Sequence, residues 1–185
     1  MPDSYSNYPK TKRDYYENML KIIGSLSRLF SESPIPYLDS RVAENLFCKS
    51  FDAQNKSRED SSADAILGKM GIGIKTFRGK SAQKIAEFNK ESLSLSSLQP
   101  LERAKRIAEL RNKRIEFTKR NYAVDDLKYH CIIREKGKML IFFKDFLNSD
   151  YLLNKALKVR TFKYMWCVTL LLCLQGNSAQ QHENF

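Results

Sequence analysis

The sequence has few of the residues on which most metal sites and disulfide frameworks depend. Its four cysteines, Cys48, Cys131, Cys167 and Cys173, form no C-x-x-C pair, and its two histidines stand far apart. Zinc sites and disulfide frameworks need closely spaced cysteines or histidines, so neither is predicted, and the thiols are expected to be reduced and buried. The same scarcity disfavours a nuclease built on histidine and metal chemistry.

Several short signatures are also absent. GKMGIGIK lacks the hydroxyl of a phosphate-binding G-x-x-x-x-G-K-[ST] loop and leads into a strand-like run, and the chain has neither a G-x-S-x-G motif nor an internal repeat. The first residues carry no apolar signal region, and the longest apolar run, residues 165–174, is too short to span a bilayer. We therefore expect a cytoplasmic protein that does not enter a membrane.

Charge is what the chain has in excess. Its 185 residues carry a formal net charge of +11 with 42% hydrophobic residues, which fits one globular domain of strongly basic character. A basic surface binds nucleic acid because bound counterions are released, so a polyanionic partner is expected. Charge alone leaves a basic protein without enzymatic activity as an alternative.

Two helices are predicted before the most informative stretch. Residues 1–10 are expected to form a loose arm, and residues 11–30 a packing helix. Its core-facing stripe is predicted to be Tyr15, Met19, Ile22, Leu26 and Leu29. Asp39 or Ser40 can cap a second helix over residues 41–51, on which Glu44 stands among apolar neighbours.

Residues 62–77, SADAILGKMGIGIKTF, predict a β-hairpin that turns over residues 68–71. If Gly68 pairs with Gly71, Asp64 lies directly opposite Lys75, on the same face of the sheet. Gly71 and Gly73 precede Lys75 on that face, which suits the approach of a bulky anion to bare backbone. With Glu87 on the next predicted helix, these residues suit phosphodiester cleavage assisted by Mg²⁺.

These residues resemble the core of the PD-(D/E)XK nucleases. GIGIKTF followed by QKIAEFN is similar to type II restriction endonucleases, and the similarity covers residues 42–134. Two positions depart from the family pattern, because Ala63 replaces a proline and Gly73 replaces the second acid. Some family members carry that acid on the following helix, about a dozen residues after the lysine, where Glu87 stands in this chain.

The resemblance implies a fold, a reaction and a set of residues. It implies an α/β fold with a central mixed sheet of about four or five strands flanked by helices. It also implies Mg²⁺-dependent cleavage of double-stranded DNA by a homodimer at a short palindrome. Asp64 and Glu87 would hold the metal, Glu44 would assist, and Lys75 would orient or deprotonate the attacking water.

Two of these acids have simpler interpretations that the sequence leaves open. Glu44 can be a rim residue paired with a lysine, and Glu87 can be a surface acid paired with Lys84. The function has alternatives too: a decayed or non-enzymatic basic DNA-binding protein, or a repair or junction nuclease of the same fold.

A long basic helix is predicted to begin at Pro100, after a serine and leucine linker, and to stop near Asn121. Between Arg103 and Arg120 it carries eight lysines and arginines against two glutamates. Such a helix can lie along a DNA groove, or it can be a solvated scaffold helix. The predicted DNA contacts are Lys69, Arg78, Lys80, Arg111, Asn112 and Arg114.

The remaining chain predicts a second hairpin and an atypical end. The hairpin covers residues 129–143, turns at Lys136 and Gly137, and contains His130, a lone histidine that we expect to be structural. Residues 1–158 are assigned to one nuclease domain with a catalytic core over residues 40–135. Residues 159–185 change from apolar to polar without turn chemistry, which favours the hypothesis of a frameshift or truncation and of an inactive copy.

Overall fold

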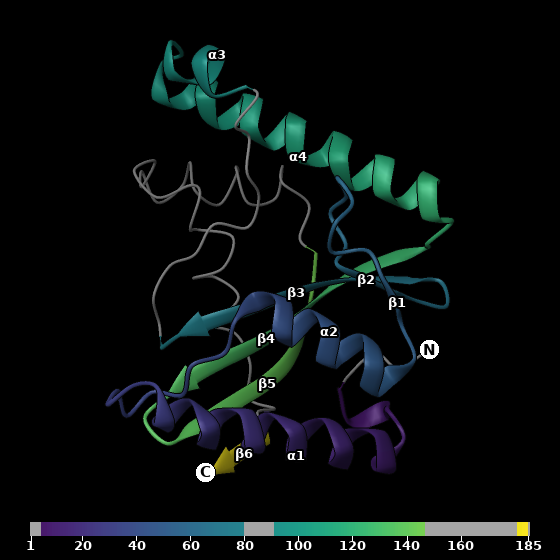
Figure 1. Cartoon of the computed structure of the whole chain (residues 1–185). Coiled ribbons are helices and arrows are strands. Elements are labelled where there is room, and N and C mark those ends of the chain that lie inside the picture. The colour runs from purple at the N-terminus through teal and green to yellow at the C-terminus, as the bar shows by residue number, and fades with distance from the viewer. Residues whose placement is uncertain (1–4, 80–90, 147–180, 185) are drawn as a thin grey trace.

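A computed structural model describes residues 5–79, 91–146 and 181–184 of the chain. Its centre is a six-stranded mixed sheet in the order β1-β2-β3-β4-β5-β6 (Figure 1). Only β3 and β4 run parallel to each other, and every other neighbouring pair is antiparallel. The strands are β1 (Gln54–Asn55), β2 (Ala65–Leu67), β3 (Met70–Arg78), β4 (Asp126–Glu135), β5 (Lys138–Asp145) and β6 (Gln181–Asn184).

Two N-terminal helices cover one face of this sheet (Figure 1). They are α1 (Lys10–Leu26) and α2 (Ser40–Phe51), and short 3-10 turns, η1 (Tyr5–Asn7) and η2 (Ser27–Leu29), flank α1. The main core lies between these helices and the sheet, where Tyr16 and Phe47 pack against Ile72 and Ile132. Asp39 caps α2, as predicted, because its side chain accepts a hydrogen bond from Arg41 N at 2.8 Å.

The predicted inner stripe of the first helix was wrong for four of its five residues, and only Met19 of the stripe packs against the core. The structure buries Tyr16, Leu20 and Gly24, whereas Tyr15, Ile22, Leu26 and Leu29 of the predicted stripe are exposed. Apolar residues occur on two sides of this helix, so the 3.6-residue period fits either side equally well. Only the shape of the sheet decides which side is buried.

The described part of the link between β3 and β4 lies over the other face of the sheet (Figure 1). It contains α3 (Ser92–Ser96) and α4 (Pro100–Tyr122), which begins at Pro100 and ends close to the predicted residue. The segment predicted as a linker forms α3 instead, because Leu95 buries its side chain against Ile107 of α4. Such a helical crossover is what a parallel strand pair requires.

The loop between β1 and β2 is tied to the C-terminal half of α4. Ser62 N donates a hydrogen bond to Thr118 Oγ1 at 2.9 Å, and Tyr122 donates its hydroxyl hydrogen to Glu59. Lys56 lies over the Tyr122 ring, 5.2 Å from its centroid. These contacts fix α4 to the segment that enters the first hairpin.

The second hairpin has the predicted turn, since Gly137 adopts a φ of +69° between β4 and β5. His130 on β4 is fully buried and its Nε2 lies 2.8 Å from Tyr16 Oη, as expected of a structural histidine. The mixed α/β architecture agrees with the prediction, with six strands instead of four or five. The helix predicted over residues 82–90 and most of the segment 159–185 lie outside the described residues. None of the described helices has the length and apolar character needed to cross a membrane.

Candidate active site

Asp64 and Lys75 lie next to each other where β3 extends beyond the end of β2. Lys75 Nζ donates a hydrogen bond to Asp64 Oδ2 at 3.0 Å. The same oxygen accepts a hydrogen bond from Ile74 N at 2.7 Å, beyond the last paired residue of β2. The two side chains are 19% and 22% exposed respectively, so the ion pair is sheltered but reachable by solvent.

The predicted register of this hairpin was wrong by two residues. Leu67 pairs with Met70 and Ala65 with Ile72, so Gly68 and Lys69 form a two-residue turn, with Gly68 at a φ of +57°. Asp64 therefore lies diagonally from Lys75 and not directly opposite it. Because side chains alternate with a period of two, a slip of two residues keeps both side chains on the same face. The contact survives for that reason.

Glu44 of α2 is the second acid near this pair. Its side chain is largely buried, and its Oε2 atom, 3.7 Å from Arg41 Nη1, accepts no hydrogen bond from the described residues. Burial raises the pKa of Glu44, and the negative charge of Asp64 adds to this effect. A hydrogen bond from Ser57 and the positive charges of Arg41 and Lys75 act in the opposite direction. The ion-pair partner of Glu44 is Arg41 on the same helix. The alternative interpretation of Glu44 had predicted a lysine.

Cys48 lies one helical turn after Glu44, on the same side of α2. Burial, followed by the charges of Glu44 and Asp64, raises the pKa of the Cys48 thiol to about 11. The thiol is therefore protonated at neutral pH and does not act as a nucleophile.

Lys75 is held in its charged form. Burial alone would lower the pKa of the Lys75 ammonium, and it is the largest single influence. The charge and hydrogen bond of Asp64, together with Tyr129 and Glu44, outweigh burial and raise this pKa. In this arrangement Lys75 is a hydrogen-bond donor and a positive charge, whereas a general base would need an uncharged amine.

The two glycines beside Lys75 do not leave bare backbone for a ligand, contrary to the sequence-based interpretation. Both are buried. A Cβ on Gly73 would come within 3.1 Å of both Phe146 Cζ and Tyr129 Cδ1, and a Cβ on Gly71 would overlap the Leu127 side chain. The glycines therefore make room for side chains that follow on β4 and after β5.

The predicted DNA contacts on β3 lie in different places. Lys69 stands in the hairpin turn, pairs with Asp125 at 3.4 Å, and is six residues from Lys75, or about 20 Å along an extended strand. Arg78 is exposed at the far end of β3 beside Arg134. Of the two, Arg78 is the nearer to Lys75 along the strand, and Lys69 does not border the Asp64–Lys75 pair.

On α4 the predicted contacts divide between the inner and outer sides. Arg111 is buried, donates a hydrogen bond to Tyr129 Oη at 3.2 Å and lies over the Phe146 ring. Asn112 and Arg114 are partly exposed. Arg111 therefore packs the helix against the sheet, which a count of basic residues could not distinguish from surface exposure.

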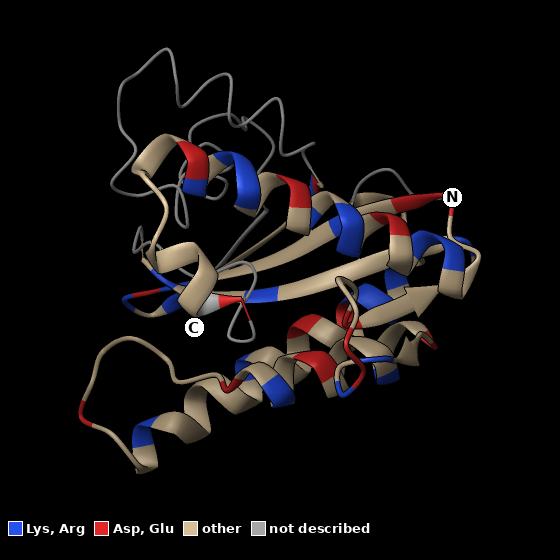
Figure 2. Cartoon of the chain, turned by 90° about the horizontal axis from the view of Figure 1, so that it is seen from above, with Lys and Arg blue, Asp and Glu red and all other residues tan. Residues whose placement is uncertain are grey.

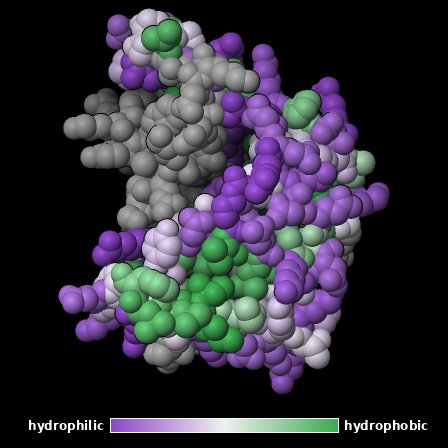
Figure 3. Space-filling model, in the orientation of Figure 1, coloured by the Kyte–Doolittle hydropathy of each residue, from purple (hydrophilic) through white to green (hydrophobic). Residues whose placement is uncertain are grey.

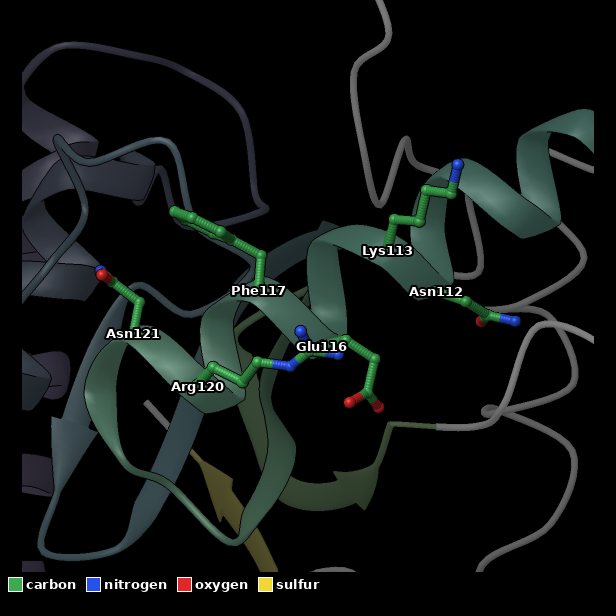
Figure 4. A pocket seen from close by; sticks show the side chains of 6 residues that line it. All are labelled: Asn112, Lys113, Glu116, Phe117, Arg120 and Asn121. Atoms are coloured by element: carbon green, nitrogen blue, oxygen red, sulfur yellow. The ribbon is translucent and has the colours of Figure 1, made fainter.

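Residues of both charge signs alternate along α4 (Figure 2). A hollow of about 540 Å³ lies along it, and Figure 4 shows the Arg120 side chain extending along the helix toward Glu116. The aromatic side chain of Phe117 is more than half exposed here. The described lining residues are Asn112, Lys113, Glu116, Phe117, Arg120 and Asn121.

Glu87 and Lys80 lie outside the described residues, so the predicted pairing of Asp64 with Glu87 is not placed. Within the described ranges, no group of three or more His, Cys, Asp or Glu side chains is arranged to hold a metal ion. Glu44 and Asp64 nevertheless supply carboxylate oxygens of the kind that Mg²⁺ prefers. The buried Glu44 Oε2, which lacks a hydrogen bond from the described residues, fits such a ligand.

Comparisons of the chain with protein-family models, with curated proteins and with solved structures gave no match.

Proposed function

We propose that this protein is a Mg²⁺-dependent endonuclease that cleaves double-stranded DNA at a specific site, in the manner of a type II restriction endonuclease. The observation that carries the proposal is the 3.0 Å contact between Lys75 and Asp64, where β3 extends beyond β2. Glu44 supports the proposal. Burying a carboxylate oxygen without a hydrogen bond, next to a second carboxylate, costs free energy unless a cation or a hydrogen-bond donor binds it.

The described residues divide the chemical work. Asp64 and Glu44, with Glu87 as the predicted third acid, would hold the ion, and bound Mg²⁺ would polarise the scissile phosphate. Lys75 is charged, so its role is to position the attacking water by donating a hydrogen bond and to offset the negative charge that develops on the phosphate. Deprotonation of the water by Lys75, the other predicted role, is not favoured by a raised pKa.

The basic side chains supply the affinity for DNA. A net charge of +11 favours binding to the phosphate backbone, and Lys113, Arg114 and Arg120 of α4 supply part of it. Arg78, Lys80 and Asn112 remain predicted DNA contacts. Arg111 has a supporting role, since it holds α4 against Tyr129.

The test is incubation of plasmid DNA with the full chain and Mg²⁺. Discrete bands are expected, whereas nicking without a pattern would indicate a repair or junction nuclease. Lys75→Ala should lower cleavage at least about 100-fold while leaving the DNA gel shift nearly unchanged, because the lost donor acts on the reacting phosphate. Lys105→Ala is the matched control, since it removes the same charge from an exposed position on α4. Equal cleavage by both variants would remove Lys75 from the mechanism.

A DNA-binding protein without catalysis is the second candidate. It is favoured by one observation, the net charge of +11, which accounts for DNA binding without any catalytic group. Thermal unfolding with and without Mg²⁺ separates the two candidates without measuring activity. A metal site predicts that Mg²⁺ raises the Tm of the wild type but not that of Asp64→Asn. A gel shift with no cleavage and no Mg²⁺ effect would favour the binding protein.

A further inference from the structure

The outward side of α1 carries an apolar stripe that nothing in the described fold covers. Figure 3 shows a continuous hydrophobic area over the lower part of the molecule, where α1 lies in Figure 1. The stripe, which we call the α1 stripe, is exposed by between 41% and 86% of each side chain. Its members are Tyr15, Ile22, Leu26, Leu29 and Phe30.

The size of the stripe matches one half of a protein interface. Side chains of this size and exposure present roughly 600 Å² of mostly apolar surface, close to the ~800 Å² that each partner contributes to a standard interface. Single exposed apolar residues are common, but a contiguous patch of this area usually marks an interaction surface.

The charges beside the stripe indicate what covers it. Asp14, Lys21 and Arg28 are spaced seven residues apart, so they follow one flank of α1 and of the 3-10 turn that continues it. Asp14 lies seven residues before Lys21, and Arg28 lies seven residues after it. Among the described residues, neither Asp14 nor Arg28 takes part in an ion pair.

This pattern is complementary to itself when the helix runs antiparallel to a copy. In a two-fold antiparallel pair centred near Lys21, Asp14 of each copy faces Arg28 of the other, and the two Ile22 side chains meet near the axis. The two Lys21 side chains oppose each other near the axis. This one repulsive contact is set against two attractive contacts between Asp14 and Arg28. A parallel pair would instead put this flank of one copy on the opposite side of the interface from the same flank of the other, so Asp14 and Arg28 would not meet.

We infer that the α1 stripe is a dimer surface on which a second copy of this chain docks through an antiparallel α1 pair. The nuclease resemblance also implies a homodimer, but it assigns no surface. The surface and the relative orientation of the two helices rest on exposed area and charge spacing, which do not depend on the nuclease proposal.

Sedimentation of the full chain tests it through charge reversal. The wild type should show a monomer–dimer equilibrium, and Ile22→Asp should weaken it at least about tenfold because a buried apolar contact is lost. Asp14→Arg and Arg28→Glu should each weaken association several-fold, because each places like charges opposite one another. Mixing these two variants should restore association, since the arginine introduced at position 14 of one copy then faces the glutamate introduced at position 28 of the other.

The control and the contrary outcomes are defined by the same geometry. Lys105→Glu changes the charge as much as Arg28→Glu does, but on α4, and should leave association unchanged. Circular dichroism confirms that each variant is folded, which is expected because all three substituted positions of α1 and η2 are exposed. A monomeric wild type, a dimer insensitive to Ile22→Asp, or a mixture that fails to restore association would each overturn the inference.

Discussion

Acidification should destabilise the protein through one side chain, His130. Burial lowers the pKa of His130 to about 3, whereas the unfolded chain has the ordinary value of 6.5. Between these two pH values the unfolded state binds a proton at His130 that the folded state does not bind. The contribution of His130 to the free energy of unfolding is therefore fully present above pH 6.5 and is lost as the pH drops toward 3.

The size of this loss follows from the two pKa values. At pH 5 the unfolded histidine is about 1.5 pH units below its pKa, which corresponds to roughly 2 kcal/mol, and at pH 4 the loss is roughly 3 kcal/mol. The surroundings give the physical reason, because Tyr16, Phe47 and Phe143 enclose the ring with centroids 4.8 to 5.4 Å away. None of these side chains offers a negative charge to an imidazolium.

The assay is urea unfolding, followed by circular dichroism at pH 7 and pH 5. The wild type is compared with a Tyr16→Phe/His130→Leu double variant, because removing both hydrogen-bond partners leaves neither of them unsatisfied. Any packing cost of the double variant is the same at both pH values and cancels. His182→Gln serves as the control for the other histidine. An equal loss of stability in wild type and double variant between pH 7 and pH 5 would refute the reasoning.

Two further predictions concern the residues around Lys75. Glu44→Gln should stabilise the protein at pH 7.5, because the raised pKa of Glu44 makes stability fall as the pH rises from 4.5 through the folded pKa, and glutamine cannot ionise. In urea unfolding, this gain in stability should shrink toward pH 4.5. A loss of stability at pH 7.5 would mean that the ion pair with Arg41 outweighs the cost of burial. Gly73→Ala should cost about 1 to 3 kcal/mol in unfolding free energy, because Phe146 and Tyr129 occupy the space that the new Cβ would need. Unchanged stability with lost DNA binding would instead support the interpretation that this glycine lets a ligand approach the backbone.

Local signals in the sequence predicted most of the elements. Pro100 marks the start of α4, Asp39 the start of α2, and Gly137 the second turn, because each residue acts on its own neighbourhood. The proximity of Asp64 and Lys75 was also predictable, since it depends on strand parity and not on the turn.

The errors concern contacts between segments distant in the chain. Two apolar sides of α1 fit the helical period, and only packing on the sheet selects the one with Tyr16 and Leu20. Gly73 and Arg111 both owe their surroundings to Tyr129 and Phe146, which belong to later parts of the chain. Composition and spacing carry no information about such neighbours.

The anchoring of Ser62 to Thr118 has a mechanical consequence. Asp64 follows Ser62 by two residues, and Asp64 N donates a hydrogen bond to Ile72 O at 2.9 Å. Hydrogen bonds therefore connect the segment that carries Asp64 to α4 on one side and to β3 on the other. The backbone that leads to Asp64 is therefore held by α4, whereas the Asp64 carboxylate is held by Ile74 N and Lys75 Nζ of β3. A displacement of α4 would act on the backbone of Asp64 before it changed the alignment of the carboxylate with Lys75.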